Sequence, residues 1–225
     1  MIRAVLIDID DTIFDFPNSG LCAMQLAAAR MGLTLPEETF SHFGAVNKAL
    51  WQRLERGEIS LDTLFYTRWD AVFSRVGVEA DGAEFERQFH RGLAESAIEV
   101  EGAGALVRYL AEKYDLYAAS NGSCAQQASR LSLAGLAPYF RAYFVSDAVG
   151  HSKPSREFFA ACFARMGGVT PEETVMVGDS LSADIAGAAA YGIHTCWFNK
   201  KGIAPPPDLA AEHTVTDLAD ICSIL

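Results

Sequence analysis

The chain has 225 residues, of which 50% are hydrophobic and 21% charged, proportions typical of a soluble globular enzyme. A formal net charge of −11 disfavours nucleic-acid polymers and anionic membrane surfaces as partners, because both are negative themselves. No apolar run reaches the ~20 residues of a membrane span, and the acidic start is unlike a signal peptide. Five scattered cysteines without a Cys-x-x-Cys pair indicate free thiols, so we expect a cytoplasmic protein.

The first predicted element is a buried strand that ends in acid. The stretch VLIDIDD, residues 5–11, places apolar side chains next to Asp8, Asp10 and Asp11. Burying an unpaired carboxylate costs several kcal/mol or more, so such groups pair, bind a metal or take up a proton. The end of this strand is therefore a candidate functional site.

Residues 17–95 predict helices throughout. The segment 21–33 has apolar residues at helical spacing and Gly32 as a stop, and Pro36 is expected to open a second helix. A third helix is predicted to start at Ser60, and a fourth to run from about Asp81 to Ala94.

From about residue 102 helices and strands alternate. Strands are predicted at residues 115–120, 143–146, 174–178 and 193–198 and near 214–215, with helices between them, including an alanine-rich one over 183–191. This order predicts an α/β protein with a doubly wound, mainly parallel, Rossmann-like sheet. We expect residues 1–16 and 96–225 to form the catalytic core and 17–95 an inserted four-helix cap.

Polar residues follow four of the predicted strands at the point where each ends. In open parallel sheets the ligand binds outside the carboxyl ends of the strands, so these residues are expected to meet. The four groups are Asp8, Asp10 and Thr12; Ser120, Asn121 and Gly122; Lys153 and Pro154; and Gly178, Asp179 and Ser180 with Asp184.

Each group alone has a plainer interpretation. Asp8 and Asp10 resemble part of a calcium loop but lack its other ligands, and they also suit a turn. Ser120-Asn121-Gly122 suits an ordinary turn, and Asp179 or Ser180 a helix N-cap. Four coincident strand ends favour a common site over four separate accidents.

The combination has a chemical rationale. Asp8, Asp10, Asp179 and Asp184 would repel one another in a partly desolvated site, and a hard cation such as Mg²⁺ would relieve the repulsion. Lys153 would add positive charge. The Ser120 hydroxyl and neighbouring N–H groups could hold phosphate oxygens.

These four motifs resemble those of the haloacid dehalogenase-like hydrolase superfamily. The resemblance implies that Asp8 attacks phosphorus to form an aspartyl-phosphate and that Asp10 serves as general acid and then base. It implies Mg²⁺ as cofactor, held by the Asp8 carboxylate, the Asp10 backbone carbonyl and Asp179.

The same resemblance implies roles for the remaining motif residues. Asp184 would support the metal. Ser120, Asn121, Lys153 and Thr12 would form the phosphate site, with Thr12 also bracing the first loop. Asp11 stands where the family often has glycine and is expected to point away from the site. His151 is expected only to cover the site mouth.

Asp10 also bears on the type of reaction. Dehalogenases of the superfamily lack an acid two residues after the nucleophile, because a halide leaves without protonation. The presence of Asp10 therefore favours a phosphomonoesterase. A phosphomutase or a sugar-phosphate phosphatase carries the same motifs and stays open, and a dehalogenase or a non-enzymatic phosphate-binding protein is the weaker alternative.

The predicted cap gives a substrate expectation. Residues 45–60, with TIFDF and TCWFN elsewhere, resemble the pyrimidine 5′-nucleotidase branch of the superfamily. A nucleoside monophosphate is the partner this implies, with a monomer or homodimer as the assembly. Phe14, Asn47, Lys48 and Trp51 are candidate substrate contacts, because a base needs a flat apolar face and a few polar groups. Core packing is the plainer reading of Trp51, and solvation that of Lys48.

Overall fold

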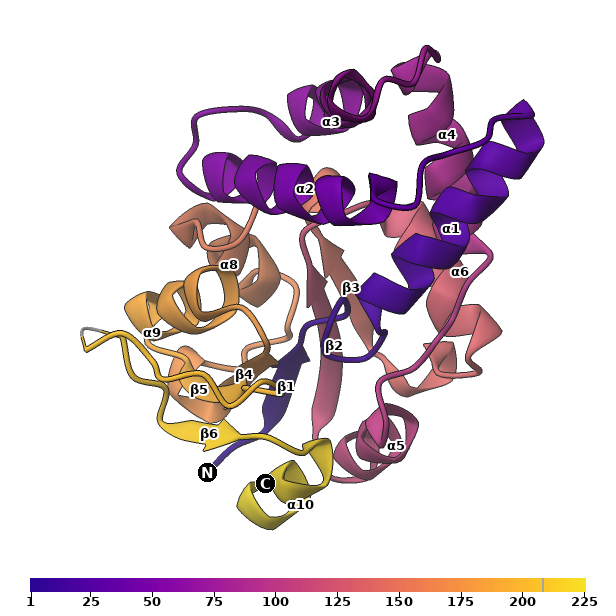
Figure 1. Ribbon diagram of the computed structural model, residues 1–225. Helices are drawn as coiled ribbons and strands as arrows, with labels where there is room; N and C mark the ends of the chain where they lie inside the picture. The colour runs from indigo at the N-terminus through magenta and orange to yellow at the C-terminus, as the bar shows by residue number, and fades with distance from the viewer. Residues whose placement is uncertain (208) are drawn as a thin grey trace. The chain divides into compact units, whose positions relative to one another are not determined.

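A computed structural model describes residues 1–207 and 209–225 of the chain (Figure 1). The chain divides into two compact units. One unit comprises Met1–Phe16 and Ala97–Leu225 and is called the α/β unit below. The other comprises Pro17–Ser96 and is called the helical unit.

In the described part of the α/β unit, six parallel strands form one sheet in the order β3-β2-β1-β4-β5-β6. The strands are β1 (Ala4–Ile7), β2 (Asp115–Ser120), β3 (Ala142–Val145), β4 (Thr174–Gly178), β5 (His194–Phe198) and β6 (His213–Val215). The chain builds outward from β1 to β3 and then returns to place β4 on the other side of β1. This reversal is the topological switch point at which doubly wound sheets bind ligands, and it confirms the predicted fold class.

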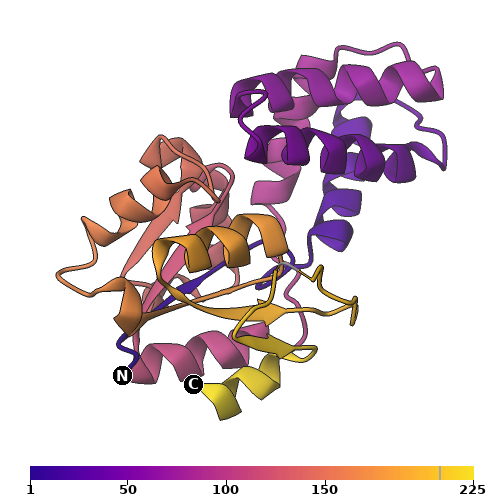
Figure 2. The same ribbon diagram turned by 90° about the vertical axis from the view of Figure 1, so that its left-hand side faces the viewer.

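Helices cover both faces of the sheet because its strands are apolar on both sides. One face packs against α5 (Ala103–Lys113), α6 (Cys124–Leu133) and α10 (Ile221–Ile224). The opposite face packs against α8 (Arg156–Phe163) and α9 (Gly187–Tyr191). Figure 2 shows this layering, with α5 and α10 together on one side of the sheet. The short helix α7 (Ser146–Val149) follows β3 directly.

The helical unit contains α1 (Phe16–Met31), α2 (Thr39–Glu55), α3 (Leu61–Val76) and α4 (Gly82–Ala94). The first residue of α1, Phe16, is the last residue of the preceding segment of the α/β unit. Its core is aromatic: Trp69 is fully buried, with its ring centroid 4.7 Å from that of Phe43 and 4.4 Å from that of Phe85. Ser60 caps α3 by accepting a hydrogen bond from the Thr63 amide at 3.1 Å.

Two local predictions are wrong. Helix α2 begins at Thr39 rather than at Pro36, because the Thr39 amide and hydroxyl both bond the Pro36 carbonyl in a turn that precedes the helix. The alanine-rich segment is not one α-helix, since Leu181–Ala186 forms a π-helical turn before α9. Over residues 1–207 and 209–225, no helix has both the length and the apolar character needed to cross a bilayer.

Candidate active site

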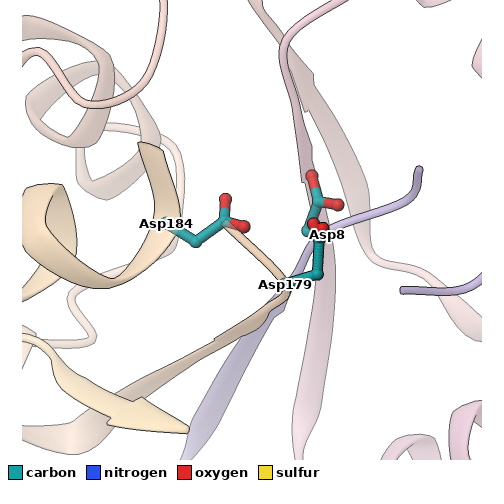
Figure 3. Close-up of side chains that lie close together, drawn as sticks. All are labelled: Asp8, Asp179 and Asp184. Atoms are coloured by element: carbon teal, nitrogen blue, oxygen red, sulfur yellow. The ribbon is translucent and has the colours of Figure 1, made fainter. Parts of the chain in front are cut away.

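Three carboxylates converge at the switch point of the sheet. Asp8 directly follows β1, Asp179 directly follows β4, and Asp184 comes from the π-helical turn behind β4 (Figure 3). One oxygen of each lies within 4.8 Å of the others. The strand register explains the meeting, because Ile7 pairs with Val177 and the next backbone bond joins the Asp8 amide to the Val177 carbonyl at 2.8 Å.

Lys153 lies among these acids. Its ammonium donates to Asp8 Oδ1 at 2.7 Å, to Asp184 Oδ1 at 2.6 Å and to the Ala119 carbonyl at 2.5 Å. The side chain is only 2% exposed. All three ammonium protons therefore have acceptors, and the lysine is held in one position.

The glycine of the fourth motif has a packing reason. A Cβ added at Gly178 would lie 2.2 Å from Asp184 Oδ2, far inside contact distance. The same Asp184 oxygen accepts the Ser180 amide at 3.0 Å, and the Trp197 indole donates to the Asp179 carbonyl at 2.8 Å. Gly178 thus lets Asp184 approach the strand end, and Trp197 holds the backbone of the Asp179 turn.

Burial disfavours the ionised forms of the carboxylates in this cluster. Burial, opposed by Lys153 and reinforced by Asp184, raises the pKa of Asp8 to about 8. Burial and then Asp8 and Asp184 raise the pKa of Asp179 well above its ordinary value. Although burial disfavours its charge, Asp184 and Asp8 raise the pKa of Lys153, so the ammonium stays charged.

The donor set fits a hard divalent cation. Three carboxylates stand against one ammonium, so the cluster would carry an excess of negative charge if all three were ionised, and a cation would offset that excess. Carboxylate oxygens are the ligands that Mg²⁺ prefers, and Mg²⁺ needs few of them because it retains water. Asp8, Asp179 and Asp184 could hold such an ion.

The Asp10 side chain is turned to other partners. Its Oδ1 accepts from Arg130 Nη1 at 2.5 Å, and its Oδ2 accepts from Gln127 Nε2 at 2.7 Å. Neither of these α6 residues is predicted from the sequence to belong to the site. The available signal was two polar residues three apart on a helix face that also carries the buried Leu131, a face expected to be apolar.

The other residues predicted for the phosphate site differ in their contacts. Thr12 is buried, with its hydroxyl 3.4 Å from Asp8 Oδ2, and Ser120 is 1% exposed with its hydroxyl 3.0 Å from Gln127 Nε2. The Asn121 amide bonds the backbone of Lys153 twice, at 2.8 Å each. The Asn121 side chain therefore fixes the backbone that carries Lys153, and a phosphate contact of Asn121 stays a prediction.

The backbone of Asp11 adopts a conformation that is typical of glycine. Its φ is 61°, in the left-handed region that glycine, asparagine and aspartate tolerate best. Its Oδ1 accepts the Phe16 amide at 3.1 Å, and burial, with Asp10 next, raises the pKa of Asp11 to about 6. Asp11 therefore closes the turn after β1. His151 is exposed.

The predicted substrate contacts divide into buried and accessible residues. Phe14 is fully buried, with the Arg130 guanidinium carbon 4.5 Å from its ring centroid, so its predicted role as a face for a base is wrong. Asn47 is 9% exposed and its amide oxygen accepts from Arg68 at 3.1 Å, so it is a structural group of the helical unit. Lys48 is exposed, and the half-buried Trp51 meets Phe65 edge-on at 6.3 Å.

The fold and the site together define a class: a Rossmann-like α/β protein with a cluster of buried carboxylates and a lysine at the switch point of its sheet. A family model for haloacid dehalogenase-like hydrolases matches residues 2–192, and the chain belongs to this family.

Three relatives are similar over most of their length. The chain is 34% identical to the HAD-hydrolase YfnB of Bacillus subtilis, covering 99% of this chain and 95% of YfnB. The crystal structure of YfnB bound to magnesium superposes with a TM-score of 0.94, covering 100% of this chain and 98% of that one. The pyrimidine 5′-nucleotidases PynA of Streptococcus pneumoniae and YjjG of Escherichia coli are 37% and 30% identical, over 88% and 98% of this chain and 84% and 96% of theirs.

Proposed function

We propose that the protein is a Mg²⁺-dependent phosphomonoesterase that hydrolyses pyrimidine nucleoside 5′-monophosphates. The observation that carries the proposal is the trio Asp8, Asp179 and Asp184 around Lys153, with Asp10 two residues beyond Asp8. Two relatives above that are named pyrimidine 5′-nucleotidases support the substrate class.

The chemistry proceeds in two half-reactions. A carboxylate oxygen of Asp8 forms a bond to phosphorus while the ester P–O bond breaks, and Asp10 gives its proton to the departing alkoxide. A water molecule then attacks phosphorus, Asp10 takes its proton, and the bond between Asp8 and phosphorus breaks. The nucleoside leaves after the first step and inorganic phosphate after the second.

The surrounding residues prepare the site for this reaction. Asp8, Asp179 and Asp184 would hold Mg²⁺, which when bound neutralises charge on the phosphoryl group and on the carboxylates. Lys153 keeps Asp8 and Asp184 in place and offers positive charge to the phosphate. The Ser120 hydroxyl and the backbone N–H groups after β2 would donate hydrogen bonds to the phosphoryl oxygens.

In this proposal the helical unit is the cap, and its side chains select the substrate. Lys48 and Trp51 are the candidate contacts of that unit that are not buried. Replacing Trp51 by alanine is expected to raise KM for uridine 5′-monophosphate about 3- to 10-fold, since an aromatic contact of ordinary strength is lost. Tyr66→Ala is the matched control, because Tyr66 is an exposed aromatic residue on α3 of the same unit. Equal KM values for the two variants would remove Trp51 from the substrate site.

A substrate panel tests the activity as a whole. Purified protein with Mg²⁺ is assayed against pyrimidine and purine nucleoside monophosphates, sugar phosphates and 2-haloacids, with Asp8→Asn alongside. Release of phosphate from pyrimidine nucleotides, lost in Asp8→Asn, is the expected result. Activity confined to sugar phosphates would contradict the substrate, and isomerisation without net phosphate release would indicate a mutase.

A further inference from the structure

A buried arginine lies beside the proposed acid/base and has no role in the mechanism above. Arg130, on α6, is 0% exposed although arginine is among the side chains most costly to bury. Its Nη1 donates to Asp10 Oδ1 at 2.5 Å and to Gln127 Oε1 at 3.1 Å. Its guanidinium also stacks on the buried ring of Phe14, at 4.5 Å. The guanidinium is thereby fixed on a rigid support.

Gln127 completes the arrangement from one helical turn earlier. Its side chain is fully buried, and its Nε2 donates to Asp10 Oδ2 at 2.7 Å and to the Ser120 hydroxyl at 3.0 Å. The amide orientation is consistent with both contacts, because its oxygen accepts from Arg130 while its nitrogen donates twice. Gln127 therefore connects the proposed phosphate-binding serine to the proposed acid/base.

Each oxygen of the Asp10 carboxylate thus accepts a hydrogen bond from a different side chain. A carboxylate with a single partner can rotate, whereas two donors from one helix fix both its position and its plane. Each oxygen keeps a further lone-pair site that can carry a proton toward a leaving group. The Asp10 side chain is also 29% exposed, so it is reachable from solvent while its two anchors are buried.

We propose that Gln127 and Arg130 are positioning residues that aim the Asp10 carboxylate at the leaving oxygen, with Gln127 linking that aim to the phosphate contact at Ser120. This inference rests on the phosphomonoesterase function proposed above. The residues act through Asp10, so their removal reduces the proton-transfer step and leaves the nucleophilic step intact. A helix anchor without this role would instead affect every substrate alike.

The test compares two leaving groups. Uridine 5′-monophosphate releases an alkoxide that needs a proton, while p-nitrophenyl phosphate releases a stable phenolate that does not. Single-turnover release of the leaving group, measured with Mg²⁺, reports the first half-reaction. The variants are Gln127→Leu and Arg130→Lys, with Gln126→Leu and Arg141→Lys as matched controls. Gln126 is next to Gln127 on the same helix, and Arg141 is in a surface ion pair with Asp115.

With uridine monophosphate, we expect the single-turnover rate to fall about 3- to 10-fold in Gln127→Leu and about 10- to 100-fold in Arg130→Lys. The second effect is larger because hydrogen bonds from a charged group are stronger than those from a neutral one. Rates on p-nitrophenyl phosphate stay within about 2-fold, and the controls change neither rate. Adding Gln127→Leu to Asp10→Asn causes no further loss, because Gln127 then has nothing to position.

Equal reductions in rate on both substrates would overturn the inference. So would a Gln127→Leu/Asp10→Asn double variant that is slower than Asp10→Asn by the full factor of Gln127→Leu. Should Arg130→Lys fail to fold, Gln127→Leu decides the question by itself. Failure of the underlying function gives a different signature, since Asp8→Asn would then still release phosphate from uridine monophosphate.

Discussion

The α/β unit and the helical unit each bury a group of charged side chains, and the two groups differ in their charge balance. In the helical unit, Arg68 and Glu86 are 2% and 7% exposed and form a bidentate pair at 2.6 and 2.7 Å. In the α/β unit, three carboxylates share the single buried ammonium of Lys153. The first group is neutral overall, whereas the second would carry an excess of negative charge if all three of its carboxylates were ionised.

Side chains of the helical unit balance the charge of Arg68 and occupy its guanidinium without any ligand. Asn47 accepts from a remaining guanidinium N–H, and the rings of Phe65 and Phe89 each lie 5.0 Å from the guanidinium carbon. Although burial opposes it, Arg68 and then His90 hold the pKa of Glu86 below its ordinary value. A balanced, fully bonded pair of this kind supports packing, whereas the unbalanced trio in the α/β unit calls for a cation. Charge balance therefore separates a structural polar cluster from a functional one.

The largest expected effect on stability comes from breaking the balanced pair. Arg68→Met leaves the Glu86 carboxylate buried beside His90 without its main partner, and we expect a loss of about 3–5 kcal/mol in the free energy of unfolding. Arg87→Met is the control, because Arg87 pairs with Glu84 on the surface of the same helix as Glu86, and its loss is expected to stay within about 0.5 kcal/mol. Urea unfolding of both variants measures the difference. Similar midpoints would contradict the structural reading of the Arg68 pair.

A divalent cation is expected to stabilise the unbalanced cluster. Mg²⁺ at about 100 times its dissociation constant adds about 2.7 kcal/mol, which corresponds to a rise in Tm of about 5–10 °C. Asp184→Asn should reduce this rise. Asp115→Asn should retain it, since Asp115 pairs with Arg141 at the surface. A thermal scan with and without Mg²⁺ gives the result, and an unchanged Tm in the unsubstituted protein would argue against the site.

Without metal, the excess charge should make stability fall as pH rises. The pKa of Asp8 is about 8 in the folded protein against an ordinary value of 3.8, so its stabilising protonated form is fully present below pH 4. That contribution is lost as pH rises through 8, and Asp179 acts in the same direction. Tm in a chelator is therefore expected to decrease between pH 5 and pH 8 more steeply than in Asp8→Asn. Parallel curves for the two proteins would contradict the unbalanced cluster.

The smallest effect concerns Asp11, which belongs to neither cluster. Asp11→Gly removes left-handed backbone strain but also the bond to the Phe16 amide, so we expect a net change within about 1 kcal/mol. Asp11→Ala keeps the strain and loses the bond, and should be less stable than Asp11→Gly by about 1 kcal/mol. Chemical denaturation of the two variants tests this order, which is reversed if the backbone conformation has no cost.

Much of the α/β unit is predictable because its signals are local. An apolar run followed by acid identifies β1, and alternating strands and helices imply a parallel sheet whose carboxyl ends share one edge. Asp8, Asp179, Asp184 and Lys153 were predicted to meet there, and they lie together in the structure.

The rest depends on tertiary packing that a sequence pattern does not encode. Periodicity assigns Gln127 and Arg130 to a helix but does not say that Asp10 lies opposite their face. Phe14 has the aromatic side chain of a ligand face but lies in the apolar core of the α/β unit, with the Arg130 guanidinium against its ring. The π-helical turn at Leu181–Ala186 is likewise invisible in a sequence whose residues suit an α-helix.

The central claim is that Asp8 carries the phosphoryl group during turnover. Mixing the enzyme with Mg²⁺ and uridine 5′-monophosphate, quenching in acid within one turnover and sequencing the peptides by mass spectrometry locates any covalent phosphate. We expect one phosphoryl group on the peptide that contains Asp8, and none in Asp8→Asn. Full-rate release of phosphate by Asp8→Asn, or phosphate trapped on another residue, would contradict it.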